Sequence, residues 1–342
     1  MRDGILSPAL PSTGPAPSQP HSPVDLRPLT TSELIDRGFI LYRTHFTGFL
    51  LLALLGQIAP LLSQIAVTAS GLNPSQNEVL DQPWQAVEKV GLIMGISLLA
   101  QVVAFAFEVV ATFFIGDAYL GKIPSVGDSL KKLSLCFGRS IWTCLLSRLV
   151  IGLTFIFPAL AMTAAYLYAL YYPPVEFLSL LVFGGLALIL FVLSMAPVLV
   201  VFMRLMVTVP ALALEGLGGW KAIQRSSTLV RFDPGLGIFY WGEMRLSFLL
   251  LPLFIIELLI LSLTSLPLVL FQVSESIRHG ATGQIATPPD STLILSQILT
   301  YLAGSVIWSL YPIATTLFYY DVRIRREGYD LEIMAQNLEQ KP

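Results

Sequence analysis

Six long apolar stretches, separated by polar segments, constrain the fold of this 342-residue chain more than any other feature. They cover residues 46–69, 90–114, 141–168, a fourth stretch that begins near residue 177 and passes Pro197 and Arg204, 238–266 and 293–320. A helix needs about 20 apolar residues to cross the hydrocarbon core, so each stretch is long enough to cross with tilt or a kink. Only 12% of the residues are charged, about half the usual share of a soluble domain. We therefore expect an all-α, polytopic membrane helix bundle with six transmembrane helices.

The distribution of basic residues predicts the orientation of these helices. Of the 20 Lys and Arg residues, only Lys89 and Arg278 lie on or beside the three loops that follow the odd-numbered stretches. The last stretch ends in Tyr319 and Tyr320, and three arginines follow within residues 323–326. Clustered Arg and Lys mark the side that is not translocated, and aromatic residues favour the interface. The pattern predicts six crossings with both termini in the cytoplasm.

The chain divides into a tail, a membrane domain and a second tail. Residues 1–28 are rich in Pro and Ser and lack an apolar period, so we expect them to be disordered. The transmembrane domain is expected over 29–334, and a short C-terminal tail over 335–342.

A short segment that mixes apolar and basic residues precedes each odd-numbered stretch. These segments lie near residues 31–45, 128–132 and 220–231. In the first, Thr30 and Glu33 have the spacing of a capping box. The arrangement predicts three transmembrane hairpins, each preceded by an interfacial amphipathic segment. The near-equal spacing is typical of an internal repeat, although any even array of hairpins would give a similar spacing.

Gly328 is expected to end the last helix. Beyond it, Leu331, Met334 and Leu338 recur at i, i+3 and i+7 and predict an apolar stripe on an acidic segment. We expect this segment to fold back onto the basic face, with a solvated tail as the alternative.

Ionisable residues within the apolar stretches are candidates for function. Five of them lie roughly ten residues from an expected cytoplasmic helix end and predict one polar layer, and a sixth lies deeper: Glu108, Arg148, Arg204, Glu243, Arg245 and, deeper, Glu257. Each such charge costs about 2.5–3.5 kcal/mol at the bilayer centre, so they are expected to pair or to line a cavity. Two interpretations remain open: a pocket for a lipid headgroup or small ion, or pairing between helices with Arg148 and Arg204 reaching the interface.

Basic residues on the expected inner face are candidate contacts for anionic lipid, each contributing about 1 kcal/mol. They are Arg37, Arg43, Lys131, Lys132, Lys221, Arg225, Arg231, Arg323, Arg325 and Arg326. The alternative is that these charges serve only to set the topology.

The sequence has no residue pattern that is typical of a catalytic site or of a cofactor site. His21, His45 and His279 are not spaced as metal ligands. The run Gly216-Leu217-Gly218-Gly219 lacks the spacing of a phosphate-binding loop, so we interpret it as a turn. We expect no catalytic residue, no metal, no cofactor and no nucleic-acid partner, and the net charge of −2 does not by itself indicate any partner.

Three parts of the chain resemble one known family: residues 34–46, residues 214–226 and, most specifically, residues 319–332 with the sequence YYDVRIRREGYDLE. The family is a bacterial multi-pass membrane-protein family related to the membrane domain of glycerophosphoryl diester phosphodiesterases. In proteins that bear this name, a separate soluble barrel carries out hydrolysis, and nothing here resembles that barrel. The resemblance implies a membrane scaffold in the bacterial inner membrane and transfers no catalytic residue.

The leading hypothesis is a non-enzymatic, lipid-interacting protein that supports a membrane process or the assembly of a partner. The main alternative is a transporter or channel for a small solute or lipid that uses the polar layer. A membrane-embedded lipid enzyme is a weaker third possibility.

Overall fold

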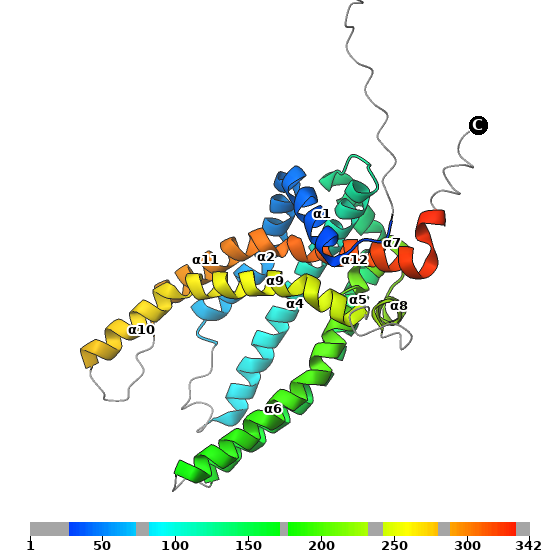
Figure 1. Ribbon diagram of the computed structural model, residues 1–342. Helices are drawn as coiled ribbons and strands as arrows, with labels where there is room; N and C mark the ends of the chain where they lie inside the picture. The colour runs from blue at the N-terminus through cyan, green and yellow to red at the C-terminus, as the bar shows by residue number, and fades with distance from the viewer. Residues whose placement is uncertain (1–26, 73–81, 172–176, 232–241, 280–287, 333–342) are drawn as a thin grey trace, which may run out of the picture.

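The computed structural model describes residues 27–72, 82–171, 177–231, 242–279 and 288–332, and every regular element in these ranges is a helix (Figure 1). Six of the helical segments are long and apolar enough to cross a membrane: 46–69, 84–119, 126–164, 184–215, 242–264 and 290–327. The six predicted spans and the all-α membrane bundle are therefore confirmed. The predicted N-terminal tail, except residues 27 and 28, and the predicted tail 335–342 lie outside the described residues.

The spans form three hairpins. The first pairs α2 (Phe46–Ala69) with α4 (Pro83–Tyr119), and the second pairs α5 (Val126–Tyr171) with α6 (Phe177–Leu205). The third pairs α9 (Gly242–Thr264), continued by α10 (Leu266–His279), with α11 (Asp290–Trp308), continued by α12 (Leu310–Glu327). Helix α11 packs on α2 and α4 packs on α5, so the first hairpin lies between the other two.

Two of the three predicted interfacial segments are separate helices. Helix α1 (Thr31–Thr44) begins with the predicted capping box, in which Glu33 N donates to Thr30 Oγ1 and Thr30 N donates to Glu33 Oε2 at 2.8 Å. Helix α8 (Trp220–Val230) follows the short helix α7 (Thr208–Glu215). The second segment is different, because Lys131 and Lys132 lie in the first turns of α5, which runs for 46 residues without a break. No proline separates them from the span, so nothing ends the helix there.

Prolines explain where three helices break. Pro210, Pro267 and Pro312 each lie within the first three residues of α7, α10 and α12. Proline lacks the N–H that would bond to the carbonyl four residues earlier, and its ring clashes with that carbonyl, whereas the first turn of a helix tolerates it. In each case the preceding helix ends a few residues before the proline, and the next helix begins with the proline in its first turn. Not every proline breaks its helix, because α9 is continuous through Pro252.

Helix α12 forms the centre of the packed core. Its residues from Pro312 to Val322 are all buried, and it contacts α1, α4, α7, α8, α9 and α11. By contrast, α6 and the second half of α9 expose large apolar side chains, such as Leu193 and Leu263, as lipid-facing helices do. The packing is densest at the end of the bundle where α1, α7, α8 and α12 meet, and α4, α6 and α9 extend away from this end (Figure 1). We call it the Arg-rich end, after Arg225, Arg323, Arg325 and Arg326.

We predict that Gly48→Ala destabilises the first hairpin, because a Cβ at Gly48 would lie 2.8 Å from Phe114 Cζ. The ring of Phe114 is 3% exposed and packs edge-on against Phe49, so it has little room to move. The expected loss is about 1–3 kcal/mol, measured as unfolding of the purified protein in detergent. Gly95→Ala in α4 is the matched control, since nothing lies within 4 Å of its added Cβ. Equal losses in the two variants would contradict this packing.

Candidate functional site: the Arg-rich end of the bundle

A single buried carboxylate, Asp321 of α12, joins three distant parts of the chain. Its side chain is 0% exposed, and it forms ion pairs with Arg245 of α9 at 2.9 Å and with Arg325 of α12 at 3.0 Å. It also accepts a hydrogen bond from Leu29 N at 2.7 Å. Two cations and one backbone donor therefore offset the cost of burying this charge.

The same two arginines also hold the residue that leads into α1. Leu29 O accepts from Arg245 Nη2 at 3.1 Å and from Arg325 Nη2 at 2.6 Å. Both backbone groups of Leu29 are thus bonded to the Asp321 cluster, and its side chain is 1% exposed. We call Leu29, Arg245, Asp321 and Arg325 the Asp321 cluster.

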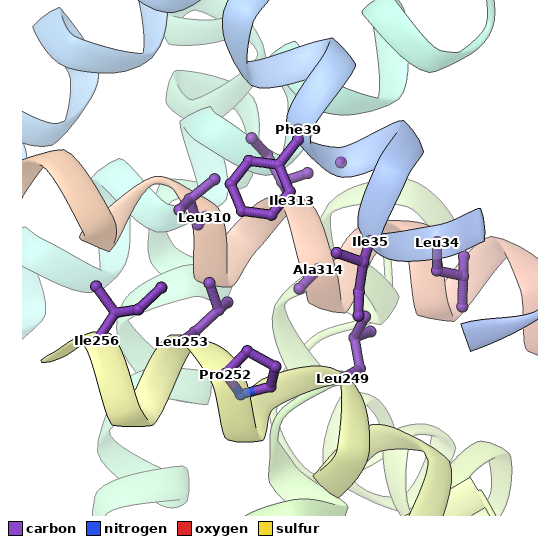
Figure 2. Close-up of a pocket in the computed structure, with 11 residues that line it drawn as sticks. Leu34, Ile35, Phe39, Leu249, Pro252, Leu253, Ile256, Leu310, Ile313 and Ala314 are labelled. Atoms are coloured by element: carbon purple, nitrogen blue, oxygen red, sulfur yellow. The ribbon is translucent and has the colours of Figure 1, made fainter. Parts of the chain in front are cut away.

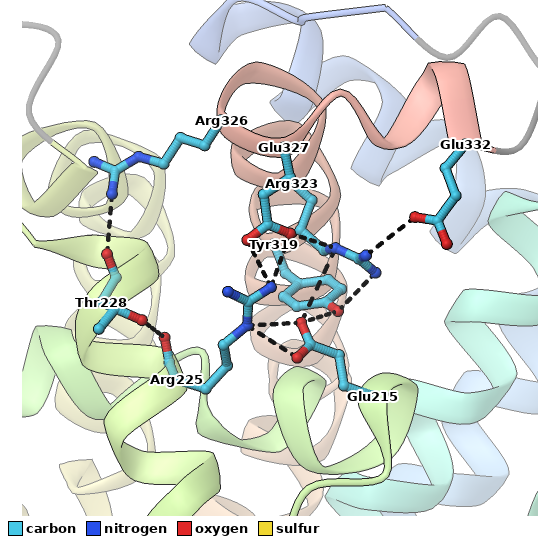
Figure 3. A network of polar contacts seen from close by, with 8 residues as sticks. All are labelled: Glu215, Arg225, Thr228, Tyr319, Arg323, Arg326, Glu327 and Glu332. Atoms are coloured by element: carbon cyan, nitrogen blue, oxygen red, sulfur yellow. Dashed lines mark hydrogen bonds and ion pairs between the residues drawn. The ribbon is translucent and has the colours of Figure 1, made fainter.

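A second network joins α7, α8 and α12 (Figure 3). Arg225 Nε donates to both carboxylate oxygens of Glu215, and Arg225 Nη2 donates to Glu327 at 2.8 Å. Tyr319 OH donates to Glu215 Oε1 at 2.8 Å, and Arg323 Nε donates to Glu327 at 3.0 Å. Both carboxylate oxygens of Glu215 therefore accept hydrogen bonds, from Arg225 of α8 and from Tyr319 of α12.

Arg326 fixes the end of α8 by a different route, through backbone carbonyls. It donates to Thr228 O and to Arg231 O, both at 2.9 Å, as Figure 3 shows for the first of these. The last turn of a helix has unsatisfied carbonyl groups, and a guanidinium group is a suitable donor for them. Arg326 therefore attaches the C-terminal end of α8 to α12.

The predicted polar layer is only partly brought together. Arg204 Nε pairs with Glu243 Oε1 at 2.8 Å and links α6 to α9. Arg245 pairs with Asp321, which the predicted layer did not contain.

The remaining members of the layer are not joined by ion pairs. Within the part of the chain that the structure describes, no ion pair joins Glu108 to Arg148, although they lie on the adjacent helices α4 and α5. Glu108 is partly buried, whereas Arg148 is exposed. Glu257 accepts a hydrogen bond from Tyr311 OH and lies apart from the layer, as expected from its depth.

Most of the candidate lipid-contact residues on α8 and α12 have partners within the protein. Arg225 and Arg323 bind glutamates, Arg325 binds Asp321, and Arg326 binds carbonyl groups. Lys132 of α5 pairs with Asp117 of α4, whereas Lys131 makes only a long contact to Asp128 at 3.5 Å and is exposed. The other candidates lie toward the surface: Arg43, Lys221 and Arg231 are exposed and Arg37 is partly exposed.

The Tyr pair at the end of the last apolar stretch was expected to favour the membrane interface, and the structure buries both rings within the protein. Tyr319 and Tyr320 are 0% and 2% exposed. Tyr320 stacks on Tyr119 of α4 with ring centroids 4.9 Å apart, and Tyr319 bonds to Glu215. The two rings therefore pack the helices together instead of facing headgroups.

The described part of the segment after Gly328 contacts Arg323 of α12 through Tyr329 and Glu332, and only Leu331 of the predicted apolar stripe lies within the described residues. Gly328 ends α12 in the left-handed conformation (φ 63°), as expected. Arg323 Cζ lies 4.1 Å from the ring centroid of Tyr329, and its Nη2 lies 3.6 Å from Glu332. Leu331 is 66% exposed, and Met334 and Leu338 lie outside the described residues.

An open cavity of about 570 Å³ lies between the fourth and fifth turns of α5 and the turn that joins α7 to α8. It is lined by Gly138, Arg139, Trp142, Gly216, Leu217, Gly218, Gly219 and Lys221, and we call it the glycine-loop cavity. The glycines at 216 and 219 have positive φ, as a tight turn requires. Arg139 Nη1 donates to Gly216 O at 2.6 Å, and Gly219 N donates to Thr143 Oγ1 at 2.7 Å, so the turn is attached to α5.

The glycine-loop cavity is positively charged. Among the described residues that line it, Arg139 and Lys221 are cationic and none is a carboxylate. The neighbouring Glu215 is turned to Arg225 and Tyr319 instead. Sequence reasoning missed Arg139, and the Gly216–Gly219 run beside a lysine was the one available signal.

A second, smaller cavity is apolar throughout. It measures about 50 Å³ and lies where α1 crosses α9 and α12, with Phe39, Leu253 and Ile313 among its lining residues (Figure 2). Its lining offers no ionisable side chain. It is a packing gap beneath the amphipathic helix α1 and supplies no chemistry.

In the described ranges, no group of three or more His, Cys, Asp and Glu residues is close enough to hold a metal ion.

Comparison of the chain with models of protein families, with curated proteins and with solved structures found no match in any of the three.

We predict that Asp321→Asn destabilises the protein by on the order of 3–5 kcal/mol, because it leaves Arg245 and Arg325 without their counter-charge. The amide keeps the volume and can still accept from Leu29, so the loss reports the charge. The measurement is the unfolding temperature in detergent. Asp128→Asn is the control, since Asp128 is 64% exposed and pairs only at 3.5 Å. Its expected cost is about 0–1 kcal/mol. A loss no larger for Asp321→Asn than for the control would contradict the assignment.

Proposed function

We propose that this chain is a non-enzymatic bacterial membrane protein that binds anionic lipid headgroups at its Arg-rich end. In this role it supports a membrane-associated process, such as lipid handling or assembly of a partner. The observation that carries the proposal is the glycine-loop cavity, in which Arg139 and Lys221 lie with no carboxylate among the described lining residues.

The donors of this cavity suit a phosphate group. A guanidinium group has five N–H donors, and Arg139 uses one of them to hold Gly216 O. Lysine contributes a compact ammonium group, and arginine and lysine are the usual side chains for phosphate recognition. The cavity also has room for a headgroup, at about 570 Å³.

The depth of the cavity supports a lipid ligand. Helix α5 has 46 residues and is about 69 Å long, which greatly exceeds the ~30 Å hydrocarbon core. Arg139 lies just before residues 141–168, the stretch expected to cross the membrane, so it is expected near the headgroup region. Trp142 and Trp220 beside the cavity are 58% and 60% exposed, as is typical of tryptophan at the membrane interface.

The other arginines of the Arg-rich end pair within the protein, which reduces the number of basic residues available to bind lipid. Arg225, Arg323 and Arg325 are engaged by carboxylates, so they contribute less to lipid binding than the sequence suggested. Arg139 and Lys221 take the main role, with the exposed Lys131 and Arg43 as peripheral contacts.

We include in this proposal the resemblance of the chain to the membrane domain of glycerophosphoryl diester phosphodiesterases. It is consistent with a membrane scaffold that lacks a catalytic barrel. The proposed location is the bacterial inner membrane with the Arg-rich end in the cytoplasm, because basic residues concentrate on the cytoplasmic side. A transporter remains the second candidate, and the cavity at Glu257 described below favours it.

We predict that phosphatidylglycerol stabilises the detergent-solubilised protein against heat more than phosphatidylcholine does. The double variant Arg139→Gln/Lys221→Gln should lose this preference. At about 1 kcal/mol per basic residue, apparent affinity for the anionic lipid should fall roughly 30-fold. The measurement is a thermal unfolding titration with each lipid, repeated at high salt, where the preference should weaken.

Lys122→Gln is the matched control, because Lys122 is an exposed cation that does not line the cavity. It should keep the preference for phosphatidylglycerol. An unchanged preference in the double variant, together with correct folding, would reject the cavity as a headgroup site.

A further inference from the structure

A second polar cavity lies deep among the spans, away from the Arg-rich end. It measures about 170 Å³ and is formed by α2, α9, α11 and α12. Its lining residues are Gln57, Glu257, Ile260, Thr300, Tyr301, Gly304, Ile307, Trp308 and Tyr311. We call it the Glu257 cavity. A cavity of ~150 Å³ holds a benzene ring, so this one has room for a small organic molecule.

The Glu257 cavity contains a carboxylate without a counter-charge. Glu257 accepts a hydrogen bond from Tyr311 OH, and no Lys or Arg is among the described lining residues. The nearest basic residue on the same helix is Arg245, about 18 Å away along α9, and it is bound to Asp321. An ionised carboxylate within a span is costly unless it pairs, so a cationic ligand would stabilise it.

Three aromatic residues line the same cavity as this carboxylate. They are Tyr301, Trp308 and Tyr311, and the hydroxyl group of Tyr311 contacts Glu257 directly. The face of an aromatic ring attracts cations, tryptophan most strongly, and cages of such rings recognise quaternary ammonium groups. Gln57 and Thr300 add an amide and a hydroxyl group that can bond to a polar substituent.

The cavity is accessible from outside the bundle. Glu257 is an exposed residue, and so are the side chains around it on α9, so the cavity opens toward the lipid-facing side of this helix. A ligand at that side can reach the carboxylate without unfolding of the hairpin. An apolar solute would gain nothing from the carboxylate, and an anion would be repelled by it.

We propose that the Glu257 cavity binds a small organic ammonium ion, with the cation against Glu257 and the rings of Tyr301, Trp308 and Tyr311. This is a different site from the glycine-loop cavity and recognises the opposite charge. It gives the chain a cation-binding activity that does not depend on headgroup binding at the Arg-rich end.

Choline and 3,3-dimethyl-1-butanol provide a direct test, because they have nearly the same shape and differ in charge. The full-length protein in detergent or nanodiscs is titrated with each by calorimetry. Choline should bind saturably, and the neutral analogue should bind at least tenfold more weakly. Equal binding of the two probes, or no saturable binding of choline, would overturn the proposal.

Two variants then locate the site. Glu257→Gln removes the charge and keeps the volume, and Trp308→Leu removes one ring; each should weaken choline binding tenfold or more. Glu88→Gln, on the exposed start of α4, should bind as the unaltered protein does. Unchanged affinity in folded Glu257→Gln or Trp308→Leu would place choline elsewhere. Saturable binding of K⁺ or Na⁺ with none of choline would show an inorganic cation site instead.

Discussion

The structure depends on the buried carboxylate of Asp321. It lies in the helix that forms the centre of the core and binds two arginines from α9 and α12 together with the backbone of Leu29. These contacts attach the entry to α1 and the start of the third hairpin to α12. Removing one partner would leave a charge buried without its counter-ion, which is far more costly than losing a surface pair. The Asp321 cluster therefore holds the Arg-rich end in one arrangement.

This arrangement explains how the two candidate sites remain separate. The network of Glu215, Arg225 and Tyr319 turns the one nearby carboxylate away from the glycine-loop cavity, which is left with Arg139 and Lys221. The Glu257 cavity has no Lys or Arg among its described lining residues, and Arg245 is about 18 Å away along α9. One cavity is therefore positive at the expected headgroup depth, and the other is negative among the spans. Each cavity favours a ligand of the opposite charge.

Local signals in the sequence predicted much of the fold. The apolar stretches predicted the six spans, the spacing of Thr30 and Glu33 predicted the capping box, and Gly328 predicted the end of α12; the structure has all three. Contacts between helices were harder, because depth along a helix does not determine which way a side chain points. Glu108 and Arg148 have matching depth but form no ion pair in the described part of the chain. The i, i+4 spacing of Asp321 and Arg325 was a usable signal for their pair, but the contact of Asp321 with Leu29 joins residues from opposite ends of the sequence.

Hydrogen–deuterium exchange at Leu29 tests the central claim most directly. Its amide donates to Asp321, so a peptide that contains Leu29 beyond its first two residues should show slow exchange of this amide in the intact protein. In Asp321→Ala, which removes the acceptor, exchange there should become fast while a peptide from the middle of α6 stays unchanged. Fast exchange at Leu29 in the unaltered protein, or equally slow exchange in Asp321→Ala, would contradict the role of Asp321 as the residue that joins the entry to α1 to α12.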